Sequence, residues 1–158
     1  MKRLDLTPIV MTGFAVGLMS LACGTPGGED GDLVVTGFSD STNFPVTPGA
    51  FDNTPGGAGS AFVAALNPFL PAAQQLVYST YLGGNSSTSS NGSDDGRAIA
   101  IDDLGRYVVG GYAESQSFPT TVGALQPTTA SPFLAECFVS ILDPLLVGSN
   151  QLVYSTLF

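Results

Sequence analysis

The residues that could do chemistry are few, and most of them are acids. The chain has 158 residues, no histidine and no tryptophan, and 13 Asp and Glu against 4 Lys and Arg, a formal net charge of −9. Without histidine it lacks the commonest general base, the usual partner of a serine or cysteine nucleophile, and the commonest metal ligand. A surface that could neutralise phosphates is missing, so nucleic acid is not expected as a partner. We predict a protein that is not an enzyme and has no catalytic residues.

The densest acids are two adjacent pairs, Asp94 with Asp95 and Asp102 with Asp103. Because Ca²⁺ takes about six to eight oxygen ligands, these carboxylates and nearby carbonyls are the candidate ligands for a calcium site. Neighbouring acids in a strand or tight turn point to different faces, and no Asp-x-Asp-x-Asp loop is present, so a solvated turn is the favoured interpretation. A glycosidase pair is disfavoured, since nothing places two carboxylates across a sugar. No other cofactor is expected.

Cysteine, serine and threonine offer little more. Cys137 lies in an apolar run, so we expect a buried small hydrophobic residue, with a reactive or intermolecular thiol as the alternative. The Ser79-Thr80 pair recurs as Ser155-Thr156, which indicates structural positions and not nucleophiles. Recurring aromatic residues favour packing between repeats over an exposed ligand platform; they are Phe44, Phe51, Phe118, Tyr78 and Tyr154.

The first 22 residues are typical of an export signal. Lys2 and Arg3 precede an uncharged apolar stretch, and the small residue Ala22 stands before Cys23. This pattern resembles a bacterial lipoprotein signal, in which the thiol of Cys23 is lipidated, although Ser20 replaces the usual Leu, Val or Ile. A secretory signal cleaved after Ala22 and an uncleaved anchor are the alternatives.

All three interpretations place the remainder of the chain outside the cytoplasm. The first predicts an outer-membrane or cell-surface lipoprotein, and the second a secreted or periplasmic protein. The exported part carries 12 acids against two arginines, so it would not be drawn to anionic lipid headgroups by charge. Contact with the membrane is therefore expected only through the lipid anchor.

The chain repeats itself over most of its exported length. Residues 34–38 return at 108–112 and residues 44–50 at 118–124, in each case 74 positions later. After a two-residue insertion, residues 62–68 and 75–80 return 76 positions later. Matched order, spacing and residue type indicate two related structural units.

Each unit has the pattern of short strands joined by turns. Ala98–Ile101 and Tyr107–Tyr112 flank a turn with Gly105, which predicts a β-hairpin. Phe138–Leu142 and Leu152–Thr156 are the third and fourth strands. The fold class is therefore all-β, with four-stranded antiparallel blades of the β-propeller type, because a sandwich would not need the unit to recur.

Several motifs resemble the repeat of the bacterial seven-bladed β-propeller proteins, in the expected order over about residues 30–158. They are Tyr78 to Gly84 (Tyr-Ser-Thr-Tyr-Leu-Gly-Gly), Asp94 to Asp102, Leu33 to Gly37, Phe44 to Phe51 and Phe62 to Pro68. The resemblance implies an extracellular repeat protein. One departure is Ala65 or Ile141 where the family often has Lys, and another is the spacer at 85–93.

The number of repeats is too small for a closed ring, which needs about four blades or more. We expect one complete unit, one unit that lacks its first strand, and an incomplete propeller. A fragment is the leading explanation; an assembly of copies and a small open sheet are the others. The predicted segments are a signal at 1–22, a tether at 23–30, a first repeat at 31–84, a Ser, Asn and Gly-rich loop at 85–96 and a second repeat at 97–158.

Two classes of function fit this architecture. The first is a non-catalytic scaffold or binding module whose loops contact a protein or a glycan. The alternative is a piece of an extracellular hydrolase or lyase whose catalytic residues lie on other blades. Two units leave apolar faces and strand edges open, so self-association, or packing against further blades, is also expected.

Overall fold

The computed structural model describes residues 20–23, 32–84, 92–130 and 134–158, with only the backbone described for residues 20–23. These ranges contain strands and two short 3₁₀ helices. The strands are β1 (Ser20–Cys23), β2 (Leu33–Ser39), β3 (Ser60–Leu66), β4 (Leu76–Leu82), β5 (Asp94–Ile101), β6 (Tyr107–Ala113), β7 (Glu136–Leu142) and β8 (Leu152–Leu157), and the 3₁₀ helices are η1 (Ala72–Gln74) and η2 (Gly148–Gln151).

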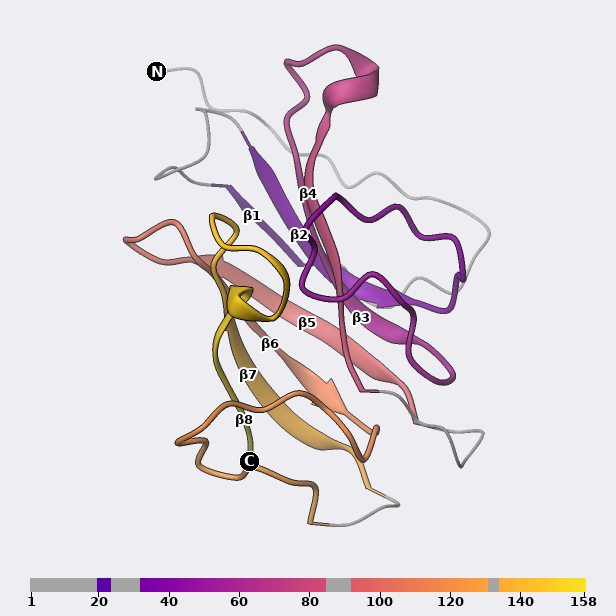
Figure 1. Ribbon diagram of the computed structural model, residues 1–158, viewed down its shortest axis with the longest axis vertical. Helices are drawn as coiled ribbons and strands as arrows, with labels where there is room; N and C mark the ends of the chain where they lie inside the picture. Colours follow the sequence, from indigo (N-terminus) through magenta and orange to yellow (C-terminus); the bar gives the residue numbers. More distant parts are fainter. Residues whose placement is uncertain (1–19, 24–31, 85–91, 131–133) are drawn as a thin grey trace.

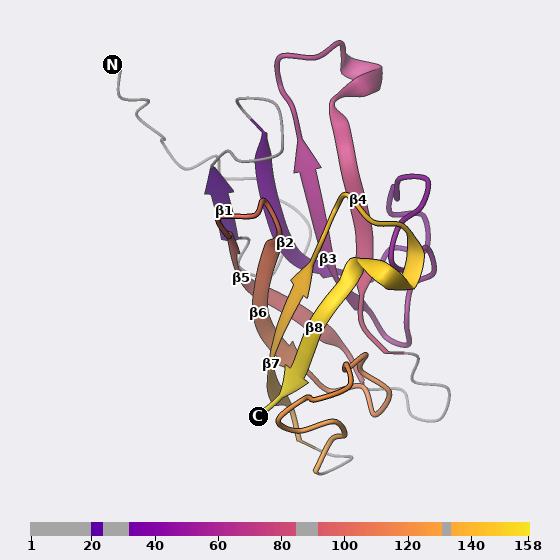
Figure 2. The same ribbon diagram turned by 60° about the vertical axis from the view of Figure 1, so that its left-hand side comes forward.

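The strands form two antiparallel meanders. One sheet has the order β1-β2-β3-β4 and the other β5-β6-β7-β8, and β5 lies beside β1 and β2 where the sheets meet (Figures 1 and 2). The prediction of an all-β fold with two propeller-like units is confirmed, and the two sheets do not close into a barrel or ring.

Both units use the same register and the same turns. Leu66 pairs with Leu76 next to a bulge, and Leu142 pairs with Leu152 next to a bulge at the corresponding place. The predicted hairpin between β5 and β6 is present, and Gly105 adopts a φ of +79° at its turn, a conformation that glycine reaches without steric cost. The repeat in the sequence is therefore a repeat of backbone geometry.

Strand β1 corrects one detail of the expected first unit, the absence of its opening strand. Ser20 pairs with Thr36 and Cys23 with Leu33, which is the register in which Ala98 and Ile101 pair with the repeat-equivalent residues of β6. In the sequence, Ser20–Ala22 fit the end of the export signal, and no strand pattern directly follows Cys23. The remaining signal residues 1–19, and residues 24–30 of the tether, lie outside the described residues.

Strand β5 is longer than the expected strand Ala98–Ile101, because it begins at Asp94. Residues 94–96 thus belong to the second sheet, where Asp94 pairs with Ala113 and Gly96 with Gly111. The acids at the start of β5 lack the apolar alternation that marks a strand in the sequence. Of the predicted loop, residues 85–91 lie outside the described residues.

The Phe-Pro segment of each unit folds back over one face of its own sheet. Phe44 packs against Phe62 at 4.7 Å between ring centroids, and Phe118 packs against Phe138 at 4.5 Å. The recurring serine secures the segment, because Ser79 donates to the Pro45 carbonyl at 2.7 Å. Its counterpart Ser155 donates to the Pro119 carbonyl. These contacts confirm the structural interpretation of the recurring Ser-Thr pairs.

The main core lies between the two sheets. From the first sheet it takes Val34, Val63, Ala65, Tyr78 and Leu82, and from the second Tyr107, Val109, Phe138, Leu142 and Leu157. Close approach of the backbone at Gly96 is part of this contact, since a Cβ there would clash with Thr36 Oγ1. The two units therefore pack face to face, as adjacent blades do, and the seam between them is where a site could form.

Candidate functional site

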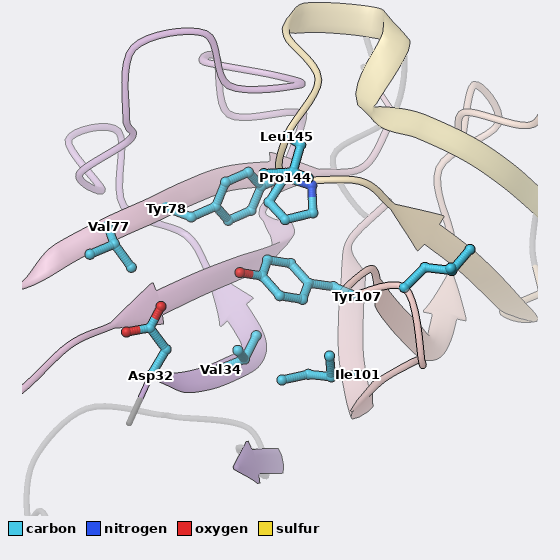
Figure 3. Close-up of a pocket in the computed structure, with 10 residues that line it drawn as sticks. Asp32, Val34, Val77, Tyr78, Ile101, Tyr107, Pro144 and Leu145 are labelled. Atoms are coloured by element: carbon cyan, nitrogen blue, oxygen red, sulfur yellow. The ribbon is translucent and has the colours of Figure 1, made fainter. Parts of the chain in front are cut away.

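The candidate site is a pocket at one end of the seam between the two sheets (Figure 3). Val34 lies in β2, Asp32 is the residue before β2, and Tyr78 lies in β4. The other wall is built by the β5–β6 hairpin and the loop after β7. The full lining is Asp32, Val34, Val77, Tyr78, Ile101, Leu104, Gly105, Tyr107, Pro144 and Leu145, around a cavity of about 150 Å³.

Two tyrosines from different units meet in this pocket. The rings of Tyr78 and Tyr107 pack edge to face with centroids 5.3 Å apart, the geometry that aromatic pairs favour. The Tyr78 hydroxyl donates a 3.0 Å hydrogen bond to Oε1 of buried Gln151. Figure 3 shows the Tyr107 hydroxyl directed toward the side of the pocket that holds Asp32.

The electrostatics of the pocket keep both tyrosines protonated at neutral pH. Burial, then the charges of Tyr107 and Asp143, raise the pKa of Tyr78 well above its ordinary value. Burial and the negative charge of Asp32 raise the pKa of Tyr107 to about 12. Both phenols therefore act as hydrogen-bond donors and not as general bases.

Asp32 is the one acid in the lining of this pocket. Its side chain is only 8% exposed, and its Oδ1 atom has no hydrogen-bond partner. A buried carboxylate oxygen without a partner carries a desolvation cost. At the rim of the pocket, Leu104 and Leu145 are 69% and 76% exposed. The arrangement is an apolar opening with an unused hydrogen-bond acceptor in its wall.

The predicted acid Asp94 lies elsewhere and has a structural role. It is fully buried, which contradicts the expected solvated turn. Its Oδ2 atom accepts hydrogen bonds from Gly84 N and Ser115 Oγ, and its Oδ1 atom from the backbone N–H groups of Glu114 and Ser115. Burial raises the pKa of Asp94, and these hydrogen bonds oppose that shift. Asp94 thus fastens the end of the first unit to a loop of the second.

The other three candidate calcium ligands are not gathered around Asp94. Asp95 is buried and forms a 2.8 Å ion pair with Arg97, although its Oδ1 atom has no hydrogen-bond partner. Asp102 lies at the far end of β5, where a hydrogen bond from Arg106 lowers its pKa. Asp103 is exposed in the turn. Within the described ranges, no three His, Cys, Asp or Glu side chains form a group that could hold a metal ion.

The two cysteines lie in different sheets. Cys23 is the last residue of β1, where its backbone pairs with that of Leu33. Cys137 in β7 is exposed, which contradicts the expected burial. Strand alternation gives the reason, because Phe138 and Ser140 face the first sheet while Cys137 faces away from it.

Sequence reasoning missed the pocket and placed Tyr78 only in packing between units. Asp32 and Tyr107 were not singled out at all. One signal was available, since both positions break the repeat. Asp32 corresponds to Arg106 in the second unit, and Tyr107 corresponds to Leu33 in the first. A departure from a repeat marks a position where the two units differ in their surroundings.

The comparisons with known proteins add no relative. No family model, no curated protein and no solved structure matches the chain. Among the residues that the structure describes, no helix has the length and hydrophobicity needed to cross a bilayer. The features that bear on function are therefore the pocket, its rim and the charge of the chain.

Proposed function

We propose that this protein is a non-catalytic, exported binding module whose pocket receives one side chain of a partner protein. The observation that carries the proposal is a small apolar pocket with exposed leucines at its rim and an unpartnered carboxylate oxygen in its wall. A large aliphatic side chain fits the opening, and the N–H or ammonium group of a Lys or Arg would use the oxygen of Asp32.

The dimensions favour a protein partner over a small molecule or a glycan. Sites for drug-sized ligands enclose roughly 300–1,000 Å³, whereas this cavity is about 150 Å³. Leucines at the rim offer an apolar contact without the flat aromatic surface on which sugars stack. The net charge of −9 favours a basic partner, because opposite charge speeds encounter and selects orientation.

The chemistry of the pocket supports a binding role over a catalytic one. Its titratable groups are two protonated tyrosines and one acid, so it offers no nucleophile paired with a base. The alternative, a piece of an extracellular hydrolase or lyase, has no observation in its favour. We propose likewise that the chain is related to the bacterial seven-bladed β-propeller repeat proteins and that it is exported with a lipid on Cys23. A lipidated Cys23 would hold the module at a membrane surface.

The test is a selection of displayed peptides on the purified chain. Peptides enriched on the wild type should contain a large aliphatic residue near a Lys or Arg. They should not bind to a double variant that carries both Leu104→Asp and Leu145→Asp, because two carboxylates at the rim disrupt the apolar contact. Asp32→Asn should weaken the binding of peptides that contain Lys or Arg and leave the binding of other peptides unchanged.

The matched control is Leu134→Asp, which changes a leucine that is 67% exposed just before β7, at the opposite end of the second sheet from the pocket. Peptide binding to this variant should equal binding to the wild type. Equal binding to the rim variant, or an absence of enriched peptides, contradicts the proposed site. If the chain binds glycans and the rim substitutions abolish that binding, the partner is a glycan and not a protein.

A further inference from the structure

The two units stack with unlike faces in contact. The first sheet contributes the face that carries Val34, Val63 and Tyr78, and the second contributes the face that carries Tyr107 and Phe138. In the repeat, Val34 corresponds to Val108 and not to Tyr107. The contact is therefore head to tail, and each unit must present its other face on the outside.

A polar link fixes this stacking. Gln151 is 3% exposed and lies between the units. Its Oε1 atom accepts from the Tyr78 hydroxyl at 3.0 Å, and its Nε2 atom donates to the Gly49 carbonyl at 2.9 Å. The backbone N–H of Gly148 donates to the same carbonyl. Gln151, Gly148, Tyr78 and Gly49 thus define the contact between the units.

The outer sides of the two units present the same groups without these contacts. Gln75 is the repeat equivalent of Gln151, and each donates to a carbonyl of its own hairpin, Leu70 and Leu146 respectively. On the opposite side, Tyr154 is the equivalent of Tyr78. Gly123, the equivalent of Gly49, has no atom within 4 Å of an added Cβ, whereas a Cβ on Gly49 would contact Val147.

Equivalent positions in the two units differ in their burial. We call the far side of the second sheet, with Val108, Cys137, Val139, Ile141 and Tyr154, the open face. Val139 and Ile141 there are partly exposed, whereas their equivalents Val63 and Ala65 are 0% exposed.

We call the far side of the first sheet at its hairpin end, with Leu33, Leu66 and Gln75, the docking face. Leu66 there is 36% exposed, whereas its equivalent Leu142 is 0% exposed. The residues that define the two faces are uncharged, and the nearby Asp95 is paired with Arg97 beside Tyr112, next to Cys137 of the open face.

We propose that a second copy of this chain binds head to tail, with its docking face on the open face of the first. The second copy is the fitting occupant because the interface already exists within the chain and the outer faces carry its repeat-equivalent residues. Gln75 of one copy then takes the place of Gln151 and meets Tyr154 and the Gly123 carbonyl of the other. A head-to-tail contact is not self-complementary, so it builds rings or open filaments.

The experiment uses the 158-residue chain with Cys23→Ser, in which Cys137 is the one thiol, and two variants of it. Ile141→Asp places a charge on the open face, and Leu66→Asp places one on the docking face. Sedimentation of the parent chain should shift from monomer toward dimer and larger species as concentration rises. Thiol labelling of Cys137 should slow over the same range, because the equivalent Ala61 is fully buried in the contact between the units.

Each variant alone should remain a monomer at every concentration. An equimolar mixture should form a dimer and nothing larger, because the two variants together retain one intact pair of faces. That result distinguishes a head-to-tail contact from a symmetric one, in which neither variant would rescue the other. Both positions are partly exposed, so the variants should fold; circular dichroism checks this, and Gln75→Ala with Tyr154→Phe replaces any variant that does not.

A parent chain that stays monomeric with concentration-independent labelling of Cys137 overturns the proposal. So does a mixture that fails to associate, or a variant that associates as the parent chain does. Leu134→Asp should associate normally, since Leu134 lies before β7 and outside both faces. The rim substitutions of the proposed partner site should likewise leave association unchanged, so the two proposals fail separately.

Discussion

At the scale of residues, Asp94, one of the four candidate calcium ligands, holds the fold together. Asp94 places four N–H or O–H donors around one buried carboxylate and connects Gly84 to Ser115. A glycine is needed beside it, because a Cβ on Gly83 would lie 2.7 Å from Asp94 Oδ2. A carboxylate suits this position because it accepts at both oxygens, which a neutral amide cannot do.

Asp94→Asn should therefore destabilise the protein. The amide keeps one acceptor oxygen, so the two donors at the other oxygen lose it. One of them has a second acceptor in either case, because Glu114 N–H also donates to the Ser93 carbonyl and Gly84 N–H also donates to Ser115 Oγ. One buried donor is left unsatisfied, so we expect the free energy of unfolding in urea to fall by about 1–3 kcal/mol. Asp103→Asn, in the exposed turn, is the matched control and should change stability by less than about 0.5 kcal/mol. An Asp94→Asn variant as stable as the wild type would show that the carboxylate is dispensable.

At the scale of elements, the short strand β1 connects export to the edge of the first sheet. The expected cleavage site between Ala22 and Cys23 lies inside β1, whose backbone pairs with β2 from Thr36 to Leu33. Cleavage there would remove Ser20, Leu21 and Ala22. The mature first unit would then have three strands and an uncovered β2 edge, and an uncovered edge invites pairing with another chain.

Processing at this position is the corresponding prediction. In a bacterium that exports lipoproteins, labelled palmitate should enter the wild type and not Cys23→Ser, and the mature wild-type chain should begin at Cys23. The physical reason is the small residue Ala22 beside a thiol after an apolar stretch. Unlabelled soluble protein that begins at Cys23 would support simple secretion instead. A chain that still begins at Met1 would support the uncleaved anchor.

At the scale of the whole molecule, stability depends on how the two units meet. Tyr78 and Tyr107 stand in that contact with pKa values raised by burial, that of Tyr107 to about 12. In the unfolded chain both would ionise near the ordinary value of 10.0. Between these values the native state binds more protons than the unfolded state, so the free energy of unfolding falls as pH rises.

The contribution of these two tyrosines to stability should therefore be complete below about pH 10 and decrease between pH 10 and 12. Each tyrosine contributes a slope of about 1.4 kcal/mol per pH unit in that window. Urea unfolding of the wild type and of Tyr107→Phe, measured from pH 8 to 12, checks this. The variant should show a shallower loss, and comparison at pH 8 separates the effect of packing. Equal slopes for the two proteins contradict the assignment of Tyr107.

The sequence alone determined the repeat, the strand and turn order and the structural role of the Ser-Thr pairs, because backbone periodicity and turn chemistry are local. Alternation along β7 also indicates that Cys137 and Phe138 point to opposite sides. Only the tertiary structure decided which side is covered, since that depends on which face the neighbouring unit presents. The burial of Asp94 and the meeting of Asp32 with Tyr78 and Tyr107 have the same origin. They arise from contacts between segments distant in the chain, which no local pattern specifies.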